Sequence, residues 1–181
     1  MDSHLYKKAA NRLPYMAGVE VLRFNTRGTQ SEAGQSEGKY DEGRSELYDV
    51  RAAINYAFDE LKGENVWVVG WSFGTNLAIS HAQDSRIKGL ILLSPTMMWS
   101  TKTDLEFWKK DGGPIYALVP EHDEYMNPVQ ARERFGNIPN IRQIDVPGAK
   151  HLWVGEPMVY RVLSEIVRVV APDRLPLPEE I

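Results

Sequence analysis

Short apolar runs alternate with longer amphipathic stretches along this chain of 181 residues. Each run is four to six residues long and almost continuously apolar; the runs cover 19–24, 66–69, 90–93, 115–119 and 141–146. Strands that are buried on both faces of a sheet have this pattern. The runs therefore predict about five strands of a mostly parallel sheet.

Between the runs, apolar residues recur at helical spacing. Helices are expected over 3–13, 45–62, 73–83, 127–135 and 157–170. Strands that alternate with helices are typical of an α/β fold in which helices flank the sheet. We expect a single domain over residues 1–171, followed by a Pro-rich tail over 172–181.

Composition narrows the functional classes. The net charge is −4 and no Lys/Arg cluster is present, so nothing favours nucleic-acid binding. The absence of cysteine excludes disulfides, thiolate metal sites and a cysteine nucleophile. No segment approaches the roughly 18 apolar residues of a membrane span. The composition is that of a cytoplasmic protein that binds no membrane.

Two segments match the Gly-x-Ser-x-Gly pattern of a serine nucleophile, GQSEG at 34–38 and GWSFG at 70–74. Ser36 lies in a polar stretch without a strand before it or an apolar helix directly after it, which is typical of a loop. Ser72 directly follows an apolar run and opens an apolar helical segment. A strand, a tight turn and a helix form the context that a nucleophile elbow requires.

A serine hydroxyl needs a base and a group that orients the base. Active residues of parallel α/β sheets gather beyond the carboxyl ends of strands. His151 follows the run at 141–146, whereas His122 follows the run at 115–119 beside Asp123, which is the better-placed group in that loop. We therefore expect His151 to be the base and Asp123 to orient it.

The order Ser72, Asp123, His151 is that of the α/β-hydrolases. The chain resembles the small, lidless, dienelactone-hydrolase-like members of this superfamily in LRFNTRG at 22–28, GWSFGT at 70–75 and PGAKH at 147–151. The resemblance implies that Ser72 is the nucleophile, His151 the base and Asp123 its orienter. It also implies that the backbone N–H of Phe73 donates to the oxyanion.

One departure from the family concerns the start of the chain. Family members begin with about three further strands, whereas this chain opens on a helix-like segment, so we expect an N-terminally truncated sheet with Met1 as an internal methionine. The resemblance places a strand between 19–24 and 66–69. These two runs are therefore expected to pair directly, or a second copy of the chain fills the gap as a homo-oligomer.

The expected function is hydrolysis of a carboxylic ester or related acyl bond of a small-molecule substrate, through an acyl-enzyme on Ser72 and without a cofactor. The alternative is a catalytically inactive hydrolase-fold protein or fragment that serves as an interaction module. Trp71 and Trp153 flank catalytic positions and are expected to bind substrate. The EHDE sequence at 121–124 lacks the ligand spacing of a metal site, so no metal is expected.

Overall fold

The computed structural model describes residues 3–110, 112–136 and 138–178. Met1 and the last three residues of the expected tail lie outside this part. The chain forms two compact units, Met1–Tyr40 with Trp153–Ile181 and Asp41–Leu152. Each unit is described by itself.

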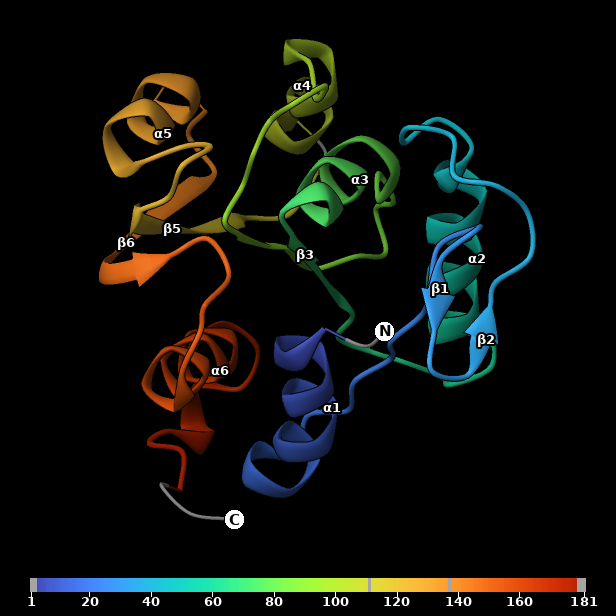
Figure 1. Ribbon diagram of the computed structural model, residues 1–181, viewed down its shortest axis with the longest axis horizontal. Helices are drawn as coiled ribbons and strands as arrows, with labels where there is room; N and C mark the ends of the chain where they lie inside the picture. Colours follow the sequence, from blue (N-terminus) through green and yellow to red (C-terminus); the bar gives the residue numbers. More distant parts are fainter. Residues whose placement is uncertain (1–2, 111, 137, 179–181) are drawn as a thin grey trace. The chain divides into compact units, whose positions relative to one another are not determined.

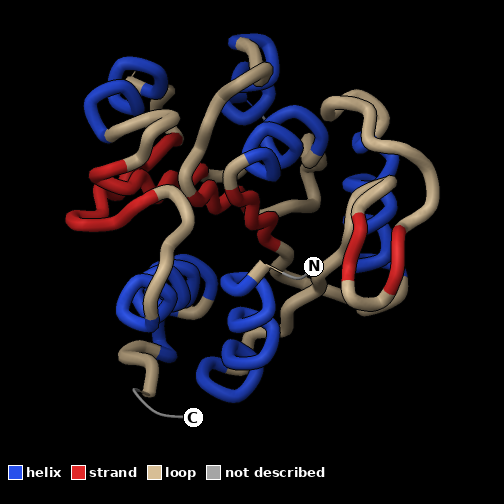
Figure 2. The backbone as a smooth tube through the Cα atoms, viewed as in Figure 1, coloured by secondary structure: helices blue, strands red, loops and turns tan. Residues whose placement is uncertain are grey.

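The larger unit contains a four-stranded parallel sheet with the order β3-β4-β5-β6. Its strands lie side by side (Figure 2) and are β3 (Trp67–Trp71), β4 (Gly89–Leu93), β5 (Ile115–His122) and β6 (Ile141–Lys150). Along the first pair, Val69 lies opposite Ile91. All five residues of β4 are buried, as expected for a strand with a neighbour on each side. The structure confirms a mostly parallel α/β sheet.

The prediction of a strand over residues 19–24 is wrong. Residues 19–24 form no strand and belong to the loop that joins α1 to β1 (Figure 1). Side-chain exposure does alternate there, with Leu22 and Phe24 exposed, but a strand also needs a partner for its backbone hydrogen bonds. In the described part of the chain β3 pairs only with β4, so the expected direct pairing with 19–24 is absent. Pairing with a second copy stays a prediction.

Helices α3, α4 and α5 lie on one side of this sheet (Figure 1). The helices of this unit are α2 (Glu46–Asp59), α3 (Phe73–His81), α4 (Lys102–Lys110) and α5 (Pro128–Phe135). One apolar cluster joins them to the strands and includes Ile54, Ile79, Leu92, Trp108, Ala117 and Phe135. The indole N–H of Trp108 also donates to the carbonyl of Ile79 at 2.8 Å, so this buried tryptophan leaves no polar group unpaired.

Helix α4 was not expected from the pattern of apolar residues. Its start carries reciprocal hydrogen bonds, because the Thr101 N–H donates to Asp104 Oδ2 at 2.7 Å and the Asp104 N–H donates to Thr101 Oγ1 at 3.3 Å. This Thr-x-x-Asp pattern is a helix-start signal that is visible in the sequence. Leu105 and Trp108, three positions apart on this helix, are buried.

The smaller unit packs α1 (His4–Ala17) against α6 (Glu156–Val170). It also holds a two-stranded antiparallel hairpin of β1 (Gln30–Ser31) and β2 (Gly34–Gln35). Within the described ranges, no helix combines the length and the apolarity that crossing a bilayer requires.

The start of the expected tail folds back onto α6. It forms a single 3₁₀ turn, η1 (Pro172–Arg174), and the hydroxyl of Tyr160 donates to the carbonyl of Leu177 at 2.6 Å. Leu177 is buried, so this part of the tail is held by a hydrogen bond and an apolar contact.

An ion pair between α1 and α6 makes the stability of this unit depend on pH. Hydrogen bonds from Arg12, at 2.7 Å, and from Lys8 lower the pKa of Glu156 from 4.5 to about 2. A carboxyl group whose pKa falls on folding stabilises the folded state above its unfolded pKa, and loses that effect as the pH falls through its folded pKa. The contribution of Glu156 is therefore complete above about pH 4.5 and disappears toward pH 2.

We expect Glu156→Gln to lower the thermal unfolding midpoint at pH 7, and the difference from wild type to shrink between pH 4.5 and 2. Circular dichroism melts at several pH values measure this difference. Glu64→Gln, at an exposed loop position, is the matched control and should show no such trend. A difference for Glu156→Gln that is the same at pH 3 as at pH 7 would contradict the assignment.

Candidate active site

Ser72 lies on the turn between β3 and α3. Its backbone has φ 53° and ψ −118°, a strained conformation for a residue other than glycine, and its N–H donates to the Leu93 carbonyl at the end of β4 at 3.0 Å. A Cβ on Gly70 would lie 2.7 Å from the carbonyl carbon of Gly74, so a larger residue does not fit there. The turn therefore holds the serine at the carboxyl end of the sheet.

The structure brings Ser72, His151 and Asp123 together. The Ser72 hydroxyl lies 2.8 Å from His151 Nε2, and His151 Nδ1 lies 2.9 and 3.0 Å from the two carboxylate oxygens of Asp123. The side chain of His151 is 6% exposed and that of Asp123 is 0% exposed. With Nδ1–H donated to the carboxylate, Nε2 is left to accept the serine proton.

The loop after β5 fixes the carboxylate of Asp123. Backbone N–H groups of Tyr125 and Met126 donate to Asp123 Oδ1 at 2.9 and 3.4 Å. Because these bonds satisfy the oxygen that also faces His151, the buried carboxylate has partners on both sides.

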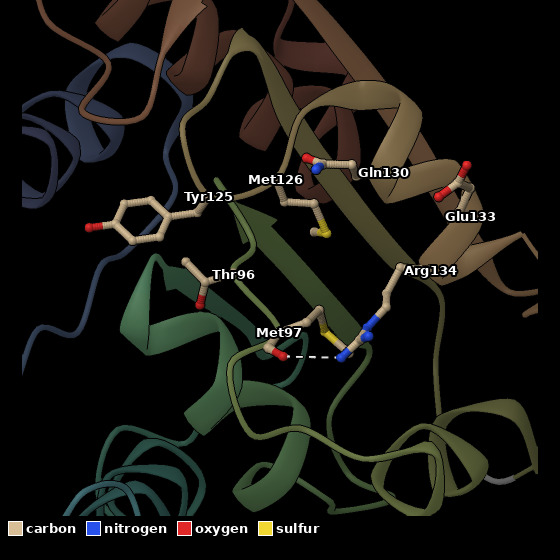
Figure 3. Close-up of a pocket in the computed structure, with 7 residues that line it drawn as sticks. All are labelled: Thr96, Met97, Tyr125, Met126, Gln130, Glu133 and Arg134. Atoms are coloured by element: carbon tan, nitrogen blue, oxygen red, sulfur yellow. Dashed lines mark hydrogen bonds between the residues drawn. The ribbon is translucent and has the colours of Figure 1, made fainter.

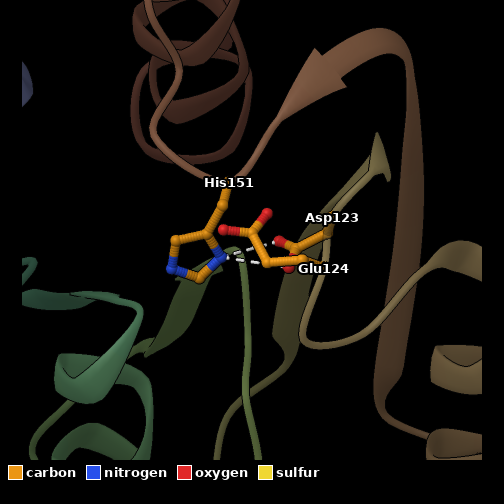
Figure 4. A group of neighbouring side chains, drawn as sticks. All are labelled: Asp123, Glu124 and His151. Atoms are coloured by element: carbon orange, nitrogen blue, oxygen red, sulfur yellow. Dashed lines mark hydrogen bonds and ion pairs between the residues drawn. The ribbon is translucent and has the colours of Figure 1, made fainter.

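A second carboxylate lies beside this pair. One atom each of Asp123, Glu124 and His151 lies within 4.8 Å of the others (Figure 4), an arrangement that could hold a cation. However, one His151 nitrogen faces Asp123 and the other faces Ser72. A metal ion on His151 would have to break one of these hydrogen bonds. The donor set therefore fits a serine–histidine–aspartate arrangement better than a metal site.

The backbone of His151 is held by two side chains. The hydroxyl of Ser94 donates to the His151 carbonyl at 2.9 Å, and the indole N–H of Trp71 donates to the same oxygen at 3.1 Å. Trp71, which the sequence suggests as a substrate contact, therefore has a bond that positions the histidine loop. Ser94 carries no motif, and only its place directly after the run at 90–93 indicates a site residue.

The other residues singled out from the sequence have separate surroundings. Ser36 Oγ donates to the Thr26 carbonyl at 2.6 Å within a loop of the smaller unit. His122 is exposed and lies 3.7 Å from Glu121. Trp153 is fully buried and belongs to the smaller unit, so it is not placed relative to Ser72.

Phe73 is the first residue of α3, and its backbone N–H therefore lies at the helix N-terminus beside Ser72. The ring of Phe73 packs against Trp99 with centroids 4.9 Å apart. This contact fixes the first turn of α3 against the segment that follows β4.

Asn76 is a site residue that sequence reasoning missed. It lies one helical turn after Ser72, is fully buried, and donates to Thr96 Oγ1 at 2.8 Å. Its carbonyl oxygen accepts from the Trp99 N–H at 3.3 Å and from the hydroxyl of Ser100 at 3.1 Å. Asn76 therefore ties the nucleophile helix to the 96–100 segment.

We expect Asn76→Ala to lower the free energy of unfolding by about 1–3 kcal/mol, because it leaves several buried polar groups without a partner. It should also lower kcat/KM of any hydrolase activity at Ser72, because the 96–100 segment loses its anchor. Urea unfolding and initial rates measure the two effects. Asn55→Ala is the matched control, because it removes one exposed hydrogen bond donated by Arg86. It should change neither the free energy of unfolding nor kcat/KM. Equal stability of Asn76→Ala and wild type would contradict this role.

Several solved structures share this fold. An alpha-beta serine hydrolase homologue from Coxiella burnetii has a TM-score of 0.77 and 23% identity, with 94% of this chain and 78% of that chain covered. A serine hydrolase without a lid from Xanthomonas campestris has a TM-score of 0.73 and 21% identity, with 93% and 74% covered. Est1E from Butyrivibrio proteoclasticus, solved with ferulic acid bound, has a TM-score of 0.73 and 18% identity, with 94% and 84% covered.

Sequence comparison gives a relative and a family. An uncharacterised protein of Rickettsia prowazekii is 26% identical over 144 aligned positions, and the match covers 75% of this chain and 59% of that protein. The chain thus spans less than two thirds of that relative's length. Residues 2–111 match the model of the alpha/beta hydrolase fold family, which confirms the resemblance seen in the sequence. Because this match covers 110 of the 181 residues, the chain belongs to the alpha/beta hydrolase fold family.

Proposed function

We propose that the protein is a serine hydrolase that cleaves the carboxylic ester of a small substrate through an acyl-enzyme on Ser72. The observation that carries this proposal is the continuous line of hydrogen bonds from the Ser72 hydroxyl through His151 to the buried carboxylate of Asp123. This line joins a nucleophile to a base and the base to an orienting group, as acyl transfer requires.

In the first half of the proposed reaction, Ser72 Oγ attacks the ester carbonyl carbon while its proton moves to His151 Nε2. The tetrahedral intermediate then collapses, the bond between the carbonyl carbon and the alkoxy oxygen breaks, and the alcohol leaves with the proton from Nε2. Asp123 stabilises the imidazolium during these steps and remains ionised.

In the second half, His151 takes a proton from water, and the resulting hydroxide attacks the carbonyl carbon of the acyl group on Ser72. Collapse of this second intermediate breaks the acyl–Oγ bond, returns the proton to Ser72 and releases the carboxylic acid. One ester and one water thus give one acid and one alcohol, and no cofactor takes part.

Negative charge develops on the carbonyl oxygen in both halves. The position of Phe73 supports its N–H as one donor to that oxyanion, since the dipole of α3 also favours negative charge at this end of the helix. The strained backbone of Ser72 supports the same proposal, because it holds Oγ at the turn rather than along the helix.

Hydrolysis of 4-nitrophenyl acetate and butyrate tests the proposed function. We expect steady release of nitrophenol above the buffer rate, preceded by a burst of about one equivalent when deacylation is slow. A folded protein that releases nitrophenol no faster than buffer would contradict the proposal and would favour an inactive hydrolase-fold interaction module. Rates on a thioester and a peptide amide with the same acyl group then identify the preferred bond.

A further inference from the structure

A cavity of about 430 Å³ lies in the larger unit (Figure 3). It is lined by Thr96, Met97, Tyr125, Met126, Gln130, Glu133 and Arg134. Its volume falls in the range of pockets that hold small ligands. Most of its lining residues end in a polar group, which is unusual for a pocket that takes a plain alkyl chain.

Two walls of the cavity are attached to the candidate catalytic residues. The ring of Tyr125 packs against the ring of His151 with centroids 4.6 Å apart, and the Tyr125 N–H binds Asp123. Thr96 lies two residues after Ser94, whose hydroxyl donates to the His151 carbonyl. A group bound in this cavity would therefore lie next to the reacting centre.

The middle of the cavity is apolar. Met97 and Met126 are buried, and their thioether side chains converge there (Figure 3). Methionine side chains adapt to methylene chains of different shape. This part of the cavity suits a short hydrocarbon segment of a substrate.

The far wall carries a cation with spare hydrogen-bonding capacity. Arg134 of α5 extends toward Met97, and its Nη2 donates to the Met97 carbonyl at 3.3 Å (Figure 3). A guanidinium has five N–H donors, and among the described residues Arg134 forms no ion pair. Arg132, on the same helix, instead pairs with Asp145 at the surface.

The charges around Arg134 leave its guanidinium group able to bind an anion. Glu133, the acidic residue of the cavity lining, points away from Met97 and Met126 (Figure 3). Gln130, one turn earlier on α5, also lines the cavity, and its Oε1 accepts from the Asn127 N–H at 3.0 Å at the start of the helix. The guanidinium alone matches a carboxylate, because the two groups can form two parallel hydrogen bonds.

We propose that this cavity binds the distal carboxylate of an acyl group, so that the enzyme prefers esters of short dicarboxylic acids over esters of fatty acids of the same length. The inference rests on the proposed ester hydrolysis at Ser72. The methylene chain lies between Met97 and Met126, and Arg134 binds the distal carboxylate and acts as the specificity-determining residue.

Two esters that differ only at the far end of the acyl chain test this preference, mono-4-nitrophenyl adipate and 4-nitrophenyl hexanoate. We expect wild type to have the higher kcat/KM for the adipate ester. Arg134→Gln should lower the ratio of the two kcat/KM values by about tenfold or more, because a charge-assisted hydrogen bond is lost. Arg134→Lys should keep part of the ratio.

Arg132→Gln is the matched control, because it removes the same charge from the same helix and should leave the ratio unchanged. A ratio that Arg134→Gln leaves unaltered, or a wild type that favours hexanoate, would overturn the inference while leaving the proposed function intact. Failure to hydrolyse either ester would instead count against the proposed function and remove the basis of both.

Discussion

Ser72→Ala is expected to lower kcat for ester hydrolysis by about 10⁶-fold, because the variant can form no acyl-enzyme. What remains should be the slow attack of water in a site that still binds the substrate. The nitrophenol released from 4-nitrophenyl butyrate at high enzyme concentration, measured at fixed time points, gives this residual rate. The free energy of unfolding should change little, since Ser72 Oγ contributes one hydrogen bond to the fold.

The chain supplies its own control for this variant. Ser36 lies in the other Gly-x-Ser-x-Gly segment, and its hydroxyl binds the Thr26 carbonyl instead of a histidine. Ser36→Ala should therefore keep nearly all activity. If Ser72→Ala retained more than about one hundredth of the wild-type kcat, the nucleophile would have to be another group.

Asp123→Asn is expected to lower kcat by about 10⁴-fold, the second largest effect. The amide keeps the shape of the side chain and can still accept from the Tyr125 N–H, but it no longer stabilises an imidazolium or selects the tautomer in which Nε2 accepts. Steady-state kinetics of the purified variant measure the loss, and a normal circular dichroism spectrum shows that the fold is kept.

Glu124→Gln is the matched change for Asp123→Asn, because both acids lie near His151 and only Asp123 has a hydrogen bond to it (Figure 4). We expect Glu124→Gln to stay within about threefold of the wild-type kcat, a difference of less than 1 kcal/mol. A large loss in this variant together with a small loss in Asp123→Asn would mean that Glu124 orients the histidine.

Much of the candidate site could be predicted from the sequence, because strand–turn–helix context and chain order are local or one-dimensional features. Ser72 follows an apolar run, and Asp123 and His151 follow two later runs, so all three could be placed at the carboxyl end of one sheet. Asn76 and Ser94 were missed because their partners are backbone and side-chain groups that only the folded loops bring near.

The fold shows a similar limit. Four of the apolar runs become strands, but residues 19–24 do not, since apolar alternation records side-chain environment and not the presence of a partner strand. Helix α4 was missed for the opposite reason. Its Thr101 and Asp104 start signal is local and readable, yet the segment at 102–110 has few apolar residues to mark a helical face.

The most direct measurement is the mass of the protein after treatment with a fluorophosphonate, followed by peptide mapping. The reagent reacts with a serine only when a base activates it. We predict one adduct per chain, on the peptide that contains Ser72, absent in Ser72→Ala and retained in Ser36→Ala. A folded wild-type protein that gains no adduct, or gains it at a different serine, would contradict the assignment of Ser72 as an activated nucleophile.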